Sequence, residues 1–486
     1  MQLSPTAPSP ELVHRRAILA LIVVLLAAFM DLLDATIVSV AAPSIAANLR
    51  SSNAELQWTL AGYTLALGAG LITGGRIGDQ FGRRRVFLLG LAGFILASIG
   101  CALAPSAGFL IAMRVAQGLA AGFMIPQVFG IIRTAFAPAA RAMALGAYGA
   151  VLGLASVAGP LLGGVLVDAN WFGLGWRAIF WVNVPLAAVG LLLGARVLPE
   201  SHEQSPARLD LTGSALAAGV SICVLLPLVQ GSEWGWPWWS LALMAAAVPI
   251  AGLFLWWERR MVTRGRQPIL DPALLRVPAF VSGLAISLLF FGAIASFFLL
   301  LSLYLQLGTG RNALDAGLII LPYAVGSIIT AGVGIQFATK AGRAVLIAGA
   351  LTLAASQTVL LIAVGGGANP SYWALAVPLF IGGLGLGLTA PSLINLVLAA
   401  VPARDAGAVS GVLTTVGQIG NAAGVAVLGL VFFGTLKATS ATAASPLAAY
   451  GTAFSSILFW QITCYAAAAA LMLLLPRRTS DAAPRV

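Results

Sequence analysis

The stretch IVVLLAAFMDLLDATIVSV, residues Ile22 to Val40, places two carboxylates, Asp31 and Asp34, inside an apolar run that is long enough to cross a membrane. An ionisable side chain at bilayer depth is costly unless it faces a partner or a water-filled cavity, so its presence there indicates function. No small-residue cleavage site follows the run, and we therefore expect this segment to remain as a membrane anchor.

The composition of the 486-residue chain is that of a polytopic membrane protein. Hydrophobic residues make up 60% of the chain and charged residues only 8%, and the mean hydropathy is +0.99. A soluble protein of this composition would leave a large apolar surface in water, so that class is excluded. The three cysteines, Cys101, Cys223 and Cys464, lie in separate apolar segments without metal-site or disulfide spacing. We expect no metal and no cofactor.

Apolar runs of about 20 residues predict fourteen membrane-spanning helices. The positive-inside rule supports this count, because with the N-terminus inside most of the 26 basic residues fall in cytoplasmic segments. We predict a multi-pass protein of the cell inner membrane with both termini in the cytoplasm. The net charge of +11 is then a topological signal, helped by anionic lipid headgroups, and we expect no nucleic-acid partner. The predicted spans lie near residues 17–42, 54–75, 86–104, 107–130, 142–167, 177–197, 211–230, 238–257, 279–305, 315–337, 344–364, 373–398, 408–431 and 451–475.

An internal repeat divides these spans into two sets of six. RVAQGLAAGFMIP, from Arg114 to Pro126, aligns with LFIGGLGLGLTAP, from Leu379 to Pro391, and two shorter matches have a similar offset. Duplicated bundles that rock about a midplane site are a recurring build of secondary transporters. We therefore predict an N-terminal six-helix bundle at 1–200, two inserted helices with flanking loops at 201–275, and a C-terminal six-helix bundle at 276–486.

The loop after the second span, GGRIGDQFGRRRVFLLG from Gly74 to Gly90, carries one acid and three consecutive cations. One interpretation is a conformational-switch loop, in which the acid pairs with an arginine and the pair breaks and re-forms. The alternative is a positively charged cytoplasmic anchor in which the acid has no role of its own. The segment resembles the loop signature of the major facilitator superfamily, with Gln80 in place of the usual arginine. The candidate switch residues are Gly75, Asp79, Gly82, Arg83, Arg84 and Arg85.

Further segments resemble motifs of the fourteen-span drug:proton antiporters of that superfamily. They are LLDATIVSVAAPSIA from Leu32, RVAQG from Arg114 and WRAIFWVNVP from Trp176. The resemblance implies an all-α polytopic membrane protein with the major facilitator fold, two six-helix bundles plus two extra transmembrane helices. It also implies a proton-coupled multidrug efflux antiporter, not an enzyme, which exports lipophilic or cationic small molecules by alternating access.

The fifth span, GAYGAVLGLASVAGPLLGG from Gly146, resembles the export-associated antiporter motif, with Ala155 where a glycine is usual. Small residues at four-residue spacing let helix backbones approach closely, and a proline bends the span. The segment could seal one bundle against the other, or it could be ordinary small-residue packing. The residues that match the motif are Gly146, Gly159, Pro160, Gly163 and Gly164.

Arg114 in the fourth span is the expected partner of the two acids. Asp31 and Asp34 are three residues apart and share one face of a helix. At 1.5 Å of rise per residue, all three residues fall at similar depth in the outer half of the bilayer. We predict a proton-coupling site in which a proton and the substrate compete. The alternative is a fixed structural pair between Arg114 and one aspartate.

A substrate surface is predicted from aromatic and amide residues within the spans. Aromatic faces suit flat or cationic amphiphiles, although tryptophans near span ends also form interfacial belts. The expected partners are a small lipophilic or cationic substrate, protons and membrane lipids, and we expect a monomer. A lipid or lipophilic-metabolite exporter, or an uptake symporter of the same fold, is the alternative. The candidate substrate-binding residues are Trp58, Tyr63, Tyr148, Trp181, Asn183, Phe297, Tyr304 and Asn395.

Overall fold

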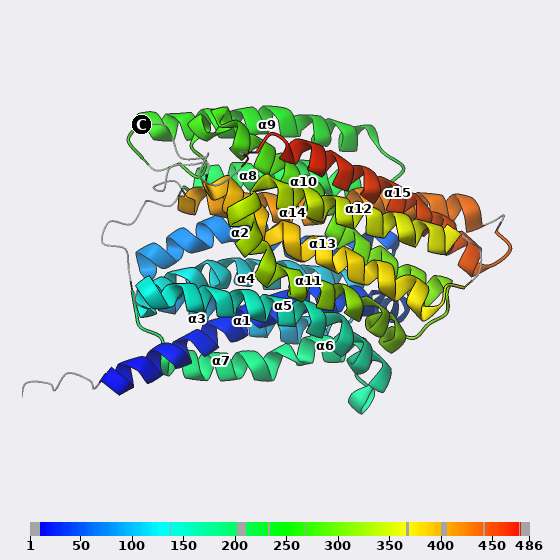
Figure 1. Ribbon diagram of the computed structural model, residues 1–486, viewed down its shortest axis with the longest axis horizontal. Helices are drawn as coiled ribbons and strands as arrows, with labels where there is room; N and C mark the ends of the chain where they lie inside the picture. Colours follow the sequence, from blue (N-terminus) through cyan, green and yellow to red (C-terminus); the bar gives the residue numbers. More distant parts are fainter. Residues whose placement is uncertain are drawn as a thin grey trace, which may run out of the picture.

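The computed structural model describes residues 10–136, 138–201, 210–231, 234–266, 268–365, 369–399, 406–440, 443–475 and 477. All regular structure in these ranges is helical, and Figure 1 shows the helices running side by side along the long axis of the molecule. In chain order they are α1 (Pro10–Leu49), α2 (Asn53–Phe81), α3 (Arg83–Ala102), α4 (Ala107–Ala135), α5 (Pro138–Ala169), α6 (Ala178–Trp181), α7 (Asn183–Val197), α8 (Leu211–Gln230), α9 (Trp238–Thr263), α10 (Pro278–Leu303), α11 (Ala313–Ala341), α12 (Arg343–Gly365), α13 (Tyr372–Ala399), α14 (Ala406–Ser440) and α15 (Pro446–Met472).

Local sequence sets the ends of several helices. Ser52 and Glu55 form a reciprocal capping box at the start of α2, with hydrogen bonds of 3.2 and 2.8 Å. Gly82 separates α2 from α3 with a φ of +106°, a conformation that residues with a Cβ rarely adopt. The predicted sixth span, 177–197, is divided into α6 and α7, and two short 3-10 turns, Trp171–Gly173 and Gly175–Arg177, precede α6.

Twelve helical segments in the described residues are long and apolar enough to cross a membrane. This confirms an all-helical, multi-pass membrane protein. The other two long helices, α2 with 29 residues and α5 with 32, are not among the twelve, so the count of fourteen spans is not confirmed.

The helix packing repeats between α1–α7, here called the N-terminal half, and α10–α15, the C-terminal half. Within the N-terminal half α1 packs on α5, α2 on α4 and α3 on α7. Within the C-terminal half α10 packs in the same way on α14, α11 on α13 and α12 on α15. The two halves meet where α5 packs on α11 and α2 packs on α14.

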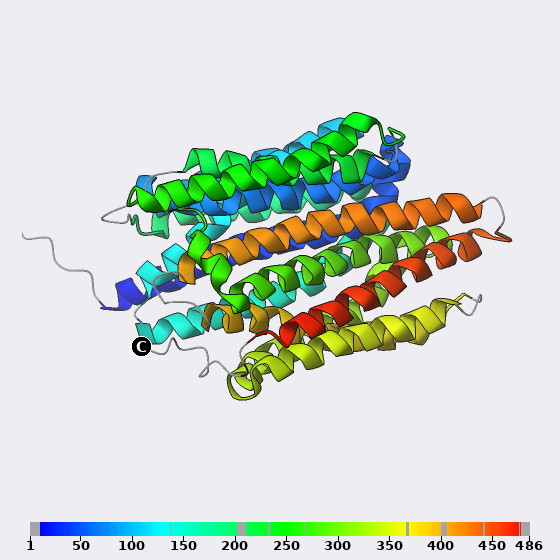
Figure 2. The same ribbon diagram turned by 90° about the horizontal axis from the view of Figure 1, so that it is seen from above.

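The hairpin of α8 and α9 lies along one flank of the molecule, as both ribbon views show (Figure 1, Figure 2). Helix α8 contacts both α2 and α14 and so lies across the seam between the halves. Only 11% of the apolar window of α9 is buried, so this helix presents most of its surface outward.

The buried cores show that the two halves share one apolar core at one end of the molecule. The largest apolar cluster joins Ile37 and Ile45 of α1 to Leu300 of α10 and Phe432 of α14. Toward the other end of α1, residues such as Val24 belong to a separate cluster that lies entirely within the N-terminal half. The C-terminal half has its own cluster there. The molecule is therefore closed across the seam at the end where α1 terminates.

Candidate functional site

Arg114 of α4 and Asp34 of α1 form an ion pair in the interior of the N-terminal half. The Arg114 Nη1 group donates to Asp34 Oδ2, and the two side chains are 1% and 0% exposed. The Nε group of Arg114 donates to the carbonyl oxygen of Thr59 at 3.1 Å. A buried charge is stable only when it is paired and hydrogen-bonded, and each member of this pair meets that requirement.

Two amide side chains complete the surroundings of Asp34. Gln117 Nε2 and Asn183 Nδ2 donate to Asp34 Oδ1 at 2.9 and 2.8 Å. Both also donate to Ser98 Oγ, at 2.8 and 3.1 Å, and Gln117 Oε1 accepts from Arg114 at 2.7 Å. Four helices, α1, α3, α4 and α7, thus converge on one carboxylate.

Tyr63 of α2 links the second acid to the same cluster. Its hydroxyl group donates to Asp31 Oδ1 at 2.5 Å, and the Arg114 guanidinium lies 4.2 Å from the centre of its ring. Asp31 keeps part of its surface exposed, whereas Asp34 is fully buried. The structure therefore brings Asp31, Asp34 and Arg114 together, with Asp34 in direct contact with the cation and Asp31 one tyrosine away.

Three of the remaining predicted substrate residues of the N-terminal half lie at different places around it. Tyr148 is half-buried, and its ring centre is 5.0 Å from that of Phe129. Trp181 packs against the apolar cluster shared by the two halves. Trp58 packs beside Val229 of α8. Tyr63 and Asn183, predicted as substrate residues, contact the acids instead.

The predicted substrate residues of the C-terminal half belong to a buried aromatic cluster. Phe297 and Tyr304 are each 1% exposed, and their ring centres lie 6.2 and 5.0 Å from that of Phe454. The side chain of Asn395 lies outside the described residues. The seven candidates whose side chains are described therefore do not form one continuous surface in this conformation.

The turn between α2 and α3 is contacted by Glu200, an acid that the sequence did not single out. Asp79 pairs with Arg83 at 2.6 Å. Glu200, just after α7, accepts from the backbone N–H of Arg84 at 3.2 Å and lies 3.6 Å from Arg85 Nε. A Cβ on Gly82 would come within 2.6 Å of the Glu200 carboxylate. Gly75 packs beside Pro126 of α4.

The glycines of α5 face two different helices. Gly159 and Gly163 pack against Thr36 and Ile37 of α1. A Cβ on Gly164 would lie 2.7 Å from backbone atoms of α11, including Leu314 Cα. From the other side, Gly317 of α11 packs against the Pro160 carbonyl group. Gly146 also lies in α5, but its surroundings are outside the described residues.

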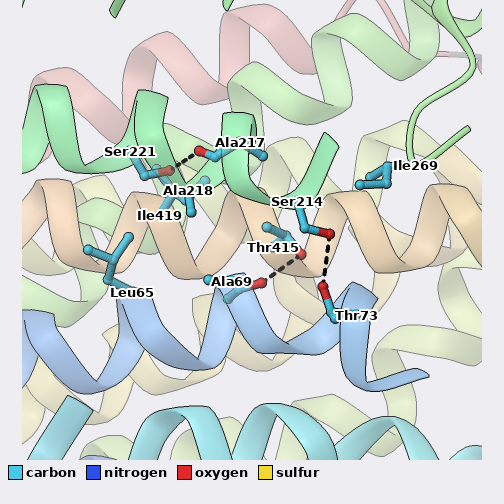
Figure 3. Close-up of a pocket in the computed structure, with 11 residues that line it drawn as sticks. Leu65, Ala69, Thr73, Ser214, Ala217, Ala218, Ser221, Ile269, Thr415 and Ile419 are labelled. Carbon is cyan, nitrogen blue, oxygen red and sulfur yellow. Dashed lines mark hydrogen bonds between the residues drawn. The ribbon is translucent and has the colours of Figure 1, made fainter. Parts of the chain in front are cut away.

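A small crevice lies where α2, α8 and α14 meet (Figure 3). Thr73 and Ser214 form a 2.9 Å hydrogen bond across it, and Thr415 Oγ1 donates to the Gly68 carbonyl at 3.3 Å. The remaining lining is mostly small and apolar. None of the seven substrate candidates with described side chains lines this crevice.

Comparison with known proteins identifies relatives along most of the chain. The model of the Major Facilitator Superfamily matches residues 24–425. The probable actinorhodin transporter of Streptomyces coelicolor is 40% identical over 436 residues, which are 89% of this chain and 75% of that protein. The tetracenomycin C resistance and export protein of Streptomyces glaucescens is 34% identical over 85% of this chain and 75% of its own length.

Solved structures support the same fold. The D-xylose-proton symporter superposes with a TM-score of 0.66 at 16% identity, over 96% of this chain and 99% of that one. At this identity the similarity concerns the fold alone. Together with the family match, it establishes that the chain belongs to the Major Facilitator Superfamily and is a membrane transporter, not an enzyme.

Proposed function

We propose that this protein is a proton-coupled multidrug efflux antiporter that exports lipophilic or cationic small molecules by alternating access. The single observation that carries the proposal is the link from the buried Asp34–Arg114 pair through Tyr63 to the half-exposed Asp31. The curated relatives support the export of drug-like molecules, since two of them are named for actinorhodin transport and for tetracenomycin C resistance and export.

In this proposal the closed end of the molecule is the outer end, and the conformation faces the cytoplasm. Fourteen helices span the inner membrane with both termini in the cytoplasm, in bundles at 1–200 and 276–486 with the hairpin helices between them at 201–275. The protein acts as a monomer in contact with membrane lipids. The glycines of α5 and their backbone contacts with α11 form the seal at the outer end.

The coupling step follows from the arrangement of charges. Asp31 exchanges its proton with water in the conformation that exposes its side chain, while Asp34 neutralises Arg114. A proton on Asp31 neutralises the carboxylate near the guanidinium. A cationic substrate favours the ionised carboxylate instead, so its binding releases the proton to water. Proton and substrate therefore compete for the same electrostatic environment, because low-dielectric surroundings strengthen every charge interaction there.

The test is export from proteoliposomes with an imposed proton gradient, using a panel of dyes, quaternary ammonium compounds and antibiotics. We expect Asp34→Asn and Asp31→Asn to abolish gradient-driven export while substrate exchange at equal concentrations persists. Asp315→Asn is the matched control, since Asp315 is an exposed acid in the first turn of α11. Uphill export by Asp34→Asn would disprove the coupling assignment.

A further inference from the structure

A second pair of buried acids lies in the hairpin, away from the Asp34 site. Asp210 caps the N-terminus of α8 and Glu258 lies near the C-terminal end of α9, and they are 5% and 0% exposed. One carboxylate oxygen of each acid accepts two hydrogen bonds. Asp210 Oδ1 accepts from Gly213 N at 2.8 Å and from Trp257 Nε1 at 2.9 Å. Glu258 Oε2 accepts from the backbone N–H of Ile269 at 2.7 Å and of Leu270 at 3.2 Å.

The second oxygen of each acid has no hydrogen-bond partner among the residues that the structure describes. These atoms, Asp210 Oδ2 and Glu258 Oε1, are both buried. They lie 2.5 and 2.6 Å from the position that a Cβ on Gly213 would occupy. The two unpartnered oxygens therefore face each other across the space that the missing glycine side chain leaves open.

The charges around this pair do not balance when both acids are ionised. The groups that act electrostatically on Glu258 are Asp210 and Arg76, and Arg76 in turn interacts with both acids. Arg76, near the end of α2, also donates to the Pro268 carbonyl oxygen at 2.6 Å. Among the described residues, one cation thus stands against two buried carboxylates, and a buried net charge is costly.

We propose that Asp210 and Glu258 together bind one proton at the cytoplasmic end of the hairpin. One of the two is then a carboxylic acid, and the other is the carboxylate that balances Arg76. Like-charged carboxylates at close range in a buried site cannot both ionise readily, which is the physical reason for the shared proton. The site is separate from Asp31 and Asp34, which lie on α1.

The proton has a structural consequence for the hairpin. The hydrogen bond between Thr73 and Ser214, together with Arg76, fastens α8 and the segment after α9 to α2. Loss of the proton adds a negative charge inside this contact, so alkaline pH weakens the attachment of the hairpin. The hairpin is therefore held to the N-terminal half in a manner that depends on cytoplasmic pH.

The experiment uses infrared difference spectroscopy on the purified full-length protein between pH 6 and pH 9. A protonated carboxyl group gives a C=O stretch that is separate from carboxylate bands and shifts in D₂O. We expect such absorption in the wild type at pH 6, and the loss of one component of it in Glu258→Gln and Asp210→Asn. Asp31→Asn, which removes the other acid proposed to carry a proton, should keep that component. Both substitutions keep an oxygen that can accept the existing backbone hydrogen bonds. Glu200→Gln is the control and should keep the band.

Thermal unfolding provides a second, independent measurement. A proton taken up in the folded state stabilises the fold at low pH, and this stabilisation is lost as the pH rises. We expect the midpoint of the wild type to fall from pH 6 to pH 9, and that of Glu258→Gln to lose at least half of this fall. A band that is unchanged in both variants would overturn the proposal. So would a midpoint governed by sodium concentration at constant pH, which would indicate a cation site.

Discussion

Replacing Asp34 by Asn should test how strongly the buried ion pair is coupled. Removing one partner of a buried pair costs about 3–5 kcal/mol, because the other charge is left uncompensated. Arg114 would keep its bond to the Thr59 carbonyl and its position over the Tyr63 ring, a cation–π contact worth about 0.5–2 kcal/mol. We therefore expect a loss at the low end of the range, about 3 kcal/mol.

A double-mutant cycle separates the pair from its surroundings. Arg114→Gln alone leaves the Asp34 carboxylate with only the Gln117 and Asn183 amides and should cost a similar amount. The double variant contains no buried charge at this position, and we expect its loss to be smaller than the sum of the two by about 2–3 kcal/mol. The measurement is the free energy of unfolding in mixed detergent micelles. Additive losses, or an Asp34→Asn variant as stable as the wild type, would refute the reasoning.

Three further variants test the helix contacts and the loop. Gly164→Ala places a methyl group 2.7 Å from Leu314 Cα, so we expect export to fall and protons to leak across the liposome membrane. Gly434→Ala, with no atom within 4 Å of its Cβ, is the control and should change neither. Equal behaviour of the two variants would contradict a seal. Gly82→Ala combines a φ of +106° with a clash against Glu200, so the free energy of unfolding should fall by about 1–3 kcal/mol, and an unchanged value would show that the loop can adapt. Glu200→Ala removes a backbone acceptor at the start of α3 and should cost about 1 kcal/mol in the same titration; a stabilised variant would be inconsistent with this role.

The charged residues of the site could be predicted because charged residues are rare within the spans and the depth of each in the bilayer can be counted along its helix. Within an apolar helix the rise per residue fixes the depth, so Asp34 and Arg114 could be matched across two spans that run in opposite directions. In the structure the two side chains form an ion pair. Sequence spacing alone did not decide whether Asp31 or Asp34 forms the ion pair with Arg114, because that choice depends on how the helices are rotated about their axes.

The neutral members of the site were harder to find. Gln117 lies three residues after Arg114 on the same helix face, which is a usable signal, but Ser98 in α3 has no feature that separates it from a serine bonded to its own helix. Asn183 and Tyr63 were assigned to substrate because amide and aromatic groups suit many ligands. Their hydrogen bonds to the acids depend on packing between helices, which no local pattern contains.

The fold itself was predictable where apolar length was decisive, and less so at the glycine-rich helices. Runs of apolar residues identified the helical segments. The repeated glycine pattern predicted two similar halves, and the division of the chain at 1–200, 201–275 and 276–486 stays a prediction. The role of Glu200 was not predictable, because an acid at a helix end gives no sign of the loop that it will meet from more than a hundred residues away.

At Gly164 and Gly317 the contact between α5 and α11 is made with backbone, since each of these glycines lies against the main chain of the other helix. A pivot built in this way has no rotamers to reset when one half tilts against the other. Its resistance to movement is therefore low and nearly independent of the transported molecule. Such a backbone contact suits a carrier that transports varied molecules. It tolerates substitutions elsewhere in the two helices far better than the addition of a methyl group at either glycine.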